Sequence, residues 1–391
     1  MALAGTLPEP RTALLASLRH NGEVLDNALI IRFSGPQSAT GENVAELHLH
    51  GGRSVVAAVL AALGAMPGLR AASPGEFTRR AFEHGRIDLA QAEGLADLLA
   101  AETQSQRRAA LTLAGGALSR LVQAWQERLL ALAAQLEAAL DFSDEDDVGG
   151  LPSDFADVLA ALTGEIEAQL SRPPSERLRD GVRVVIAGPP NAGKSSLLNA
   201  LIGRDAAIIS AQAGTTRDLV EAPTAIGGAP FLLIDTAGLR EGGDAIEAIG
   251  VERARASLAA ADLILWLGAP GDCPDPARSI LVHAKSDLVS GGGEANVAVS
   301  SKTGDGLESL LRLLIQRSTS LLPSESEVSL NERHRAAFRD CSNWLKEAEN
   351  PDPVIAAESL RQARAALDSV TGQAGVEDML DSLFGRFCIG K

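Results

Sequence analysis

The chain has 391 residues, of which 46% are hydrophobic, so it is long enough for two or three domains with large cores. A formal net charge of −16 disfavours broad contact with nucleic-acid phosphates, and 3% aromatic residues with no tyrosine argue against a stacking platform for single strands. No apolar run reaches the ~20 residues of a membrane helix, no secretory signal opens the chain, and the three cysteines lack metal-site or C-x-x-C spacing. We therefore expect a cytoplasmic protein.

The order of periodic segments predicts several domains. Residues 1–83 alternate as strands do and predict a partial α+β domain, whereas 84–178 are helical, with a long helical run from Arg86 to Phe142. Strands and helices alternate over 179–322, which is typical of a parallel sheet, and helical periodicity returns over 323–391. We predict an α/β P-loop G domain inserted in a discontinuous all-α domain and preceded by a truncated α+β domain.

A phosphate-binding motif follows the first strand of the inserted domain. The apolar run from Val182 to Ala187 leads into Gly-Pro-Pro-Asn-Ala-Gly-Lys-Ser at 188–195, which fits G-x-x-x-x-G-K-[ST] before a helix. The loop's N–H groups are expected to hold phosphate oxygens, Lys194 to reach the β- and γ-phosphates, and Ser195 to ligate Mg²⁺. The expected nucleotide-binding residues here are Asn191, Ala192, Gly193, Lys194, Ser195 and Ser196.

Two switch-like motifs come next in the order that guanine-nucleotide proteins use. Thr215 and Thr216 lie in Gly-Thr-Thr-Arg-Asp, where a threonine can present its hydroxyl to Mg²⁺ and its N–H to the γ-phosphate. The strand from Phe231 to Asp235 ends in Asp-Thr-Ala-Gly, so Asp235 is expected to hold Mg²⁺ through water and the Gly238 N–H to sense the γ-phosphate. Thr236 and Ala237 complete this motif.

The base-recognition signal departs from the usual Asn-Lys-x-Asp. The sequence reads Ala284-Lys285-Ser286-Asp287, in which Asp287 can accept both guanine N–H donors and Lys285 can lie against the base. Ala284 replaces the asparagine that braces this loop, so we expect guanine specificity with weakened affinity. Ser300, Ser301 and Lys302 match the last base-contacting loop.

Catalysis lacks one familiar group. Leu239 stands where Ras-like enzymes keep a water-positioning glutamine, so either catalysis is lost or another group supplies it. The acidic candidates nearby are Glu241, Asp244, Glu247 and Glu252.

These motifs together resemble one family over essentially the whole chain. Asn191 in the phosphate loop, Gly-Thr-Thr-Arg-Asp at 214–218, Asp-Thr-Ala-Gly-Leu-Arg at 235–240 and the terminal Cys-Ile-Gly-Lys at 388–391 are similar to MnmE (TrmE), the tRNA-modification GTPases. The N-terminal motifs Gly-Pro-x-Ser-x-Thr-Gly-Glu at 35–42 and Pro-Gly-Glu-Phe-Thr-x-Arg-Ala-Phe at 74–82 extend the resemblance.

The resemblance implies a GTPase that uses K⁺ in place of an arginine finger and whose G domains dimerise across the nucleotide. Asn191 matches the side-chain K⁺ ligand, and the loop that completes the K⁺ site is matched by Ser210, Gln212 and Thr215. Glu247 matches the glutamate that orients the attacking water through a second water. With Lys194, Thr216 and Asp235 it makes up the implied catalytic set for GTP hydrolysis with Mg²⁺.

The resemblance also implies partners. MnmE proteins form homodimers and act with MnmG (GidA), an FAD protein, to place aminomethyl or carboxymethylaminomethyl groups on C5 of the wobble uridine of tRNA. The one-carbon unit comes from 5,10-methylene- or 5-formyl-tetrahydrofolate, for which Glu46, Arg86 and Lys391 are the matching residues, with Cys388 nearby as a candidate catalytic thiol. The chain starts after the segment with the family's folate-binding arginine, which puts folate binding in doubt. Given the acidic composition, we expect tRNA contact largely through MnmG.

Two alternatives stay open at this point. A ribosome-assembly GTPase of the Era or Der type also carries asparagine in the phosphate loop, although the terminal Cys-Ile-Gly-Lys argues against it. A non-catalytic, nucleotide-dependent scaffold would explain Ala284, but the retained Lys194 and Asp235 argue against decay of the G domain.

Overall fold

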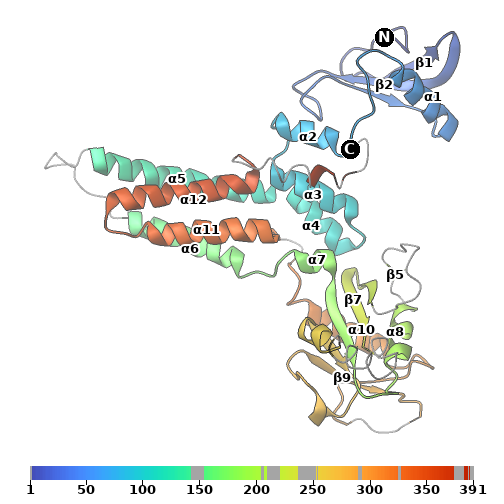
Figure 1. Cartoon of the computed structure of the whole chain (residues 1–391), viewed down its shortest axis with the longest axis vertical. Helices are drawn as coiled ribbons and strands as arrows, with labels where there is room; N and C mark the ends of the chain where they lie inside the picture. Colours follow the sequence, from blue (N-terminus) through green and yellow to red (C-terminus); the bar gives the residue numbers. More distant parts are fainter. Residues whose placement is uncertain are drawn as a thin grey trace. The chain divides into compact units, whose positions relative to one another are not determined.

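The computed structural model describes residues 2–141, 154–203, 207–208, 221–236, 252, 254–288, 293–324, 327–373, 383–385 and 387. The chain divides into two compact units, Met1–Leu99 with Asp368–Lys391, and Ala100–Leu367 (Figure 1). None of the described helices is both long and apolar enough to cross a membrane. The predicted fold class is confirmed: an α+β N-terminal domain precedes a discontinuous helical domain into which a G domain is inserted. The exact domain boundaries stay a prediction.

The first unit begins with an antiparallel sheet in the order β1-β2-β3, formed by β1 (Leu14–His20), β2 (Glu23–Phe33) and β3 (Val44–His48). Alternate residues of these strands, including Leu18, Ala28 and Ile30, pack under Val59 and Ala62 of α1 (Arg53–Gly64). The unit continues with α2 (Glu76–Glu83) and α3 (Leu89–Ala100), which form a second core with Phe384 and Phe387.

The helical domain is built from α4 (Gln104–Ala114), α5 (Ala117–Asp141), α6 (Phe155–Leu170), α11 (Glu332–Glu347) and α12 (Pro353–Thr371). Its core includes Trp125, whose ring lies edge-on to Phe338 at 5.1 Å and whose Nε1 donates to Glu165. The predicted helical run from Arg86 to Phe142 contains three helices, α3, α4 and α5. Thr103 makes a capping box with Gln106, and the 115–116 glycine pair separates α4 from α5.

The G domain is a seven-stranded sheet in the order β10-β9-β8-β4-β7-β6-β5. Its strands are β4 (Val182–Ala187), β5 (Ala207–Ile208), β6 (Glu221–Ile226), β7 (Ala229–Asp235), β8 (Leu263–Trp266), β9 (Ser279–Ala284) and β10 (Val297–Val299). β4 pairs in parallel with β7 and β8, and β6 runs antiparallel to β7. The carboxyl ends of β4, β7, β8 and β9 therefore share one edge, where ligands bind in such sheets.

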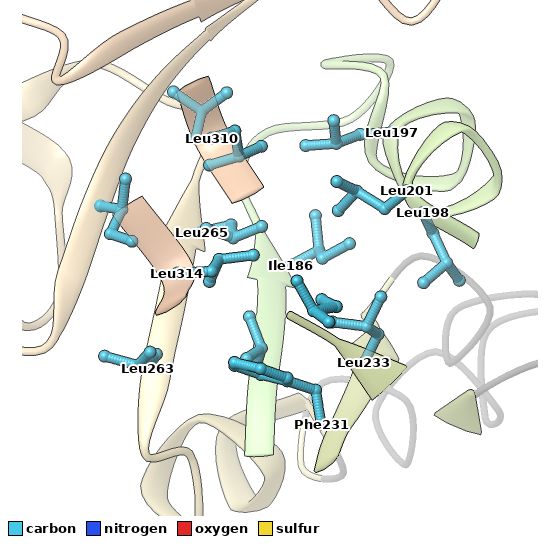
Figure 2. Packing of buried hydrophobic residues seen from close by; sticks show 14 of the residues in the cluster. Ile186, Leu197, Leu198, Leu201, Phe231, Leu233, Leu263, Leu265, Leu310 and Leu314 are labelled. Atoms are coloured by element: carbon cyan, nitrogen blue, oxygen red, sulfur yellow. The ribbon is translucent and has the colours of Figure 1, made fainter. Parts of the chain in front are cut away.

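Helices cover the sheet and fix this edge. Figure 2 shows Leu197 and Leu201 of α8 (Lys194–Ile202) and Leu310 and Leu314 of α10 (Leu307–Ser318) packed about Ile186 of β4. Five of the six residues of β4 are apolar and buried, as expected for a strand covered on both faces, and Arg183 near its start is partly buried. A short 3₁₀ turn, η1 (Pro270–Asp272), follows β8.

The two chain segments that connect the G domain to the helices are bonded to each other. α7 (Glu176–Asp180) lies in the first segment, and the residue before it, Ser175, donates its N–H to the carbonyl of Leu330 at 3.0 Å. Glu176 accepts the N–H of Glu332 at 2.7 Å. The insert therefore starts and ends at one place.

Candidate functional site

The phosphate loop has positive φ angles at its two glycines, as the sequence pattern predicts. Gly188 and Gly193 have φ of +151° and +99°, and Asn191 has φ of +59°. A Cβ at Gly188 would lie 3.1 Å from Leu267, which explains the need for glycine there. α8 starts at Lys194, and the first N–H groups of a helix have no partner in the helix itself. The loop and helix end thus form a site for an anion.

Lys194 is held inside this loop. Its side chain is 6% exposed, and Nζ donates to the carbonyl oxygens of Gly188 at 3.2 Å and Pro189 at 2.9 Å. These bonds keep the ammonium over the loop, where its charge can meet phosphate oxygens.

Ser195 and Asp235 meet across the ends of α8 and β7. The Ser195 hydroxyl donates to Asp235 Oδ2 at 2.5 Å, and the carboxylate is 3% exposed. Thr236 anchors the end of β7 because its hydroxyl donates to the Ile186 carbonyl at 3.0 Å. A hydroxyl beside a carboxylate is the oxygen donor set that Mg²⁺ prefers, so these two residues fit the expected metal.

The structure also brings together the residues that the sequence predicts to recognise the base. Lys285, with φ of +58°, donates from Nζ to the Asn191 carbonyl at 2.7 Å and so ties this loop to the phosphate loop. Ser300 is buried, and its hydroxyl donates to Asp287 Oδ1 at 2.8 Å, which orients the exposed carboxylate. Ser301 and Lys302 follow in the same loop.

Ala284 lies at the end of β9 beside a cavity of 570 Å³. Asn191, Ala192 and Lys285 line the same cavity. The small side chain leaves room next to both loops where the usual asparagine would stand.

Nine predicted site residues lie outside the described residues: Ser210, Gln212, Thr215, Thr216, Ala237, Gly238, Glu247, Cys388 and Lys391. Two predicted folate residues are described. Glu46 is exposed on β3, 3.1 Å from His48 Nε2, and Arg86 is exposed just after α2. Their roles stay predictions.

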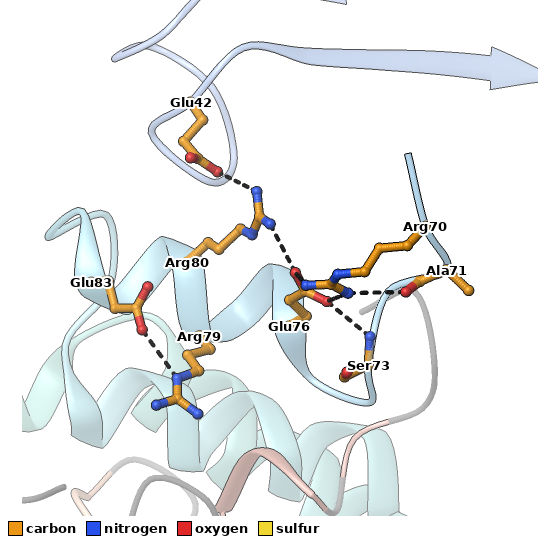
Figure 3. A network of polar contacts seen from close by, with 8 residues as sticks. All are labelled: Glu42, Arg70, Ala71, Ser73, Glu76, Arg79, Arg80 and Glu83. Carbon is orange, nitrogen blue, oxygen red and sulfur yellow. Dashed lines mark hydrogen bonds and ion pairs between the residues drawn. The ribbon is translucent and has the colours of Figure 1, made fainter. Parts of the chain in front are cut away.

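Sequence reasoning gave no role to a charged network around α2, shown in Figure 3. Glu76 accepts Arg70 Nη1 and Nη2 at 2.7 and 2.8 Å, Arg80 Nη2 at 2.8 Å and the Ser73 N–H at 2.9 Å. Arg80 also binds Glu42 at 2.9 Å. These bonds, those of Arg70 above all, lower the pKa of Glu76 to about 2. The available signal was the Pro-Gly-Glu-Phe-Thr-x-Arg motif, whose charged residues the resemblance left without a function.

The comparisons with known proteins cover the whole chain. Residues 2–86 match the family described as "GTP-binding protein TrmE N-terminus", and 89–388 match "MnmE helical domain". The chain is 59% identical over 394 residues to the tRNA modification GTPase MnmE of Rhizorhabdus wittichii, covering 99% of this chain and 89% of that protein.

The chain belongs to the MnmE family.

Further MnmE relatives agree with this assignment. The tRNA modification GTPase MnmE of Erythrobacter litoralis is 55% identical, covering 100% of this chain and 93% of that protein. The protein of the same name from Sphingopyxis alaskensis is 54% identical, covering 100% and 97%. Membership makes the chain a GTP hydrolase of the tRNA-modification class. The roles of the residues in the phosphate and base loops stay predictions.

Proposed function

We propose that this chain is a K⁺-stimulated GTPase that works with an FAD-dependent MnmG (GidA) partner to modify C5 of the wobble uridine of tRNA. One observation supports the hydrolase part above all. Lys194, the Ser195–Asp235 pair and the Ser300–Asp287 pair meet at one edge of the sheet, although they come from four separate segments.

Each group has a distinct task in GTP hydrolysis. Lys194 and the loop N–H groups stabilise negative charge on the phosphates, and this counts most as the β–γ bond breaks. Asp287, oriented by Ser300, accepts the two guanine N–H donors, whereas adenine would leave the carboxylate unpaired. Mg²⁺ held by Ser195, Asp235 and Thr216 would neutralise phosphate charge.

K⁺ is assigned a site beside Asn191. The left-handed backbone at Asn191 lets the phosphate loop turn there, and its side-chain carbonyl is a suitable oxygen ligand. Ser210, Gln212 and Thr215 are proposed to complete the site, with Glu247 orienting the attacking water. K⁺ supplies the positive charge that an arginine finger supplies elsewhere.

The tRNA reaction is assigned to the complex of a homodimer with MnmG in the cytoplasm. A net charge of −16 leaves most phosphate contact to the partner. Glu46, Arg86 and Lys391 are proposed to bind the folate that donates the one-carbon unit, with Cys388 near this folate as a candidate catalytic thiol. The result is an aminomethyl or carboxymethylaminomethyl group on the uridine.

The first experiment measures GTP turnover in KCl and in NaCl over a range of protein concentrations. Stimulation by K⁺ that grows with concentration supports the cation site and dimerising G domains. Asn191→Gly keeps the left-handed backbone but removes the proposed ligand, so it should lose K⁺ stimulation and keep GDP binding. Equal slow rates of the parent protein in both salts would refute the mechanism.

A second experiment tests the tRNA reaction. Nucleosides of tRNA incubated with MnmG, GTP, a folate, ammonium or glycine as the source of nitrogen, and this chain are compared with a reaction that omits the chain. Modified wobble uridine only in the complete reaction supports the proposal. An unchanged nucleoside profile in both reactions contradicts it.

A further inference from the structure

Helix α4 of the helical domain contacts the G domain at the turn between β6 and β7, and it also contacts α7 in the first connecting segment. The N–H and the hydroxyl of Ser105 donate to the carbonyl of Gly228, at 3.2 and 2.7 Å. Gln106 Nε2 donates to the Leu178 carbonyl at 2.8 Å. Ser105 lies in the first turn of α4, where free N–H groups and the helix dipole favour an acceptor.

The Gly228 carbonyl belongs to the tight turn between β6 and β7. Gly227 and Gly228 have φ of +59° and +81°, and a two-residue type I′ hairpin turn requires positive φ at both positions. A Cβ at Gly227 would lie 2.6 Å from Cδ1 of Ile315 in α10, and one at Gly228 would lie 3.5 Å from Gln104. The turn is therefore fixed between α10 and the start of α4.

The other end of β7 is the nucleotide site. β7 has seven residues, so its ends are about 20 Å apart. It ends at Asp235, which accepts the Ser195 hydroxyl at 2.5 Å. β6 pairs with β7 along its length, from Ile226 opposite Ala229 to Glu221 opposite Ile234. One hairpin thus joins the α4 contact to the magnesium-binding end of the site.

We propose that Ser105 is a positioning residue for the GTPase that couples helix α4 to the nucleotide site through the β6–β7 hairpin. By holding Gly228 it restricts where the hairpin sits, and so it restricts Asp235 at the other end. A change of nucleotide that moves Asp235 then also moves Gly228 relative to Ser105 and strains the hydrogen bond between them. Coupling of this kind is reciprocal, so α4 must in turn bias the choice between GDP and GTP. The proposal rests on the GTPase function.

The test compares Ser105→Ala with Thr112→Ala. Thr112 lies on the same helix, and its hydroxyl donates to the Arg108 carbonyl of that helix at 3.0 Å instead of to the G domain, so it is a matched control. Kd is measured for GDP and for a non-hydrolysable GTP analogue, and hydrogen exchange of the α4 amides is followed in both states. We expect Ser105→Ala to change the ratio of the two Kd values by about 3- to 10-fold, the usual effect of one hydrogen bond. It should also reduce the nucleotide dependence of exchange in α4.

Ser105→Thr keeps the hydroxyl and should restore both readouts, which a purely structural role at this position would not require. Thr112→Ala should behave as the parent protein. An unchanged Kd ratio in Ser105→Ala, or α4 exchange that is the same with both nucleotides in the parent protein, would overturn the proposal. The Kd values and the hydrogen exchange do not depend on GTP turnover. Absence of K⁺ stimulation would therefore refute the proposed K⁺-dependent hydrolysis, but it would not decide whether α4 is coupled to the nucleotide site.

Discussion

Ala284→Asn is expected to tighten guanine-nucleotide binding. Ala284 is partly buried at the end of β9, beside a cavity of 570 Å³ that Asn191 and Ala192 of the phosphate loop also line. An asparagine has room there, and its amide can bond to the loop backbone. Each such bond contributes about 1 kcal/mol net, so two give about 2 kcal/mol, or a Kd about 30-fold lower.

The assay is equilibrium binding of a fluorescent GDP to the parent protein, Ala284→Asn and Ala284→Leu. Leucine has nearly the shape of asparagine but no hydrogen-bonding atoms, so it should give no gain. A Kd of Ala284→Asn within about 2-fold of the parent, or an equal gain with leucine, would refute the assignment of this position as a polar brace.

Three further changes test other parts of the structure. The lowered pKa of Glu76, about 2 against 4.5 for a free side chain, means that its stabilising contribution is complete above pH 4.5 and is lost as the pH falls toward 2; Glu76→Gln should flatten this loss in thermal unfolding at a series of pH values, and an unchanged pH profile would contradict it. Gly306→Ala should lower the free energy of unfolding by more than about 2 kcal/mol, since φ is +74° and the new Cβ would lie 1.9 Å from the carbonyl oxygen of Ala298, whereas Gly271→Ala meets nothing within 4 Å and should be neutral. Asp287→Asn should weaken GTP binding by about 100-fold or more and improve XTP binding, measured by competition, because the amide donates where guanine also donates; retained preference for GTP would argue against Asp287 as the base reader.

The phosphate site could be predicted because its signal is contiguous. Eight successive residues, from the end of β4 through the first two residues of α8, determine the loop, and backbone geometry then places Lys194 and Ser195. Asp287 and Ser300 were predicted as separate loops, and their meeting follows from adjacent parallel strands, β9 and β10.

The contacts between the domains, and those within the charged network around α2, could not be predicted from the sequence. Ser105 and Gly228 are 123 positions apart, and nothing in either local pattern shows that one will cap the other. The helix break at Thr103 was readable, because threonine followed three residues later by glutamine is a capping-box signature. Helical periodicity alone does not divide this run into helices, since it reports which face is buried and not where one helix ends and the next begins.

The hydrogen bonds between the two segments that connect the G domain to the helices bear on the order of folding. α6 ends at Leu170 and α11 starts at Glu332, and Arg335 of α11 bonds to the carbonyl oxygens of Leu170 and Arg172. Closing a loop of about 160 flexible residues to make this contact costs on the order of 4 to 5 kcal/mol of chain entropy. A G domain that folds first brings Ser175 and Leu330 within a hydrogen bond and removes most of that cost. If the G domain folds first, it serves as the template on which the split helical domain assembles.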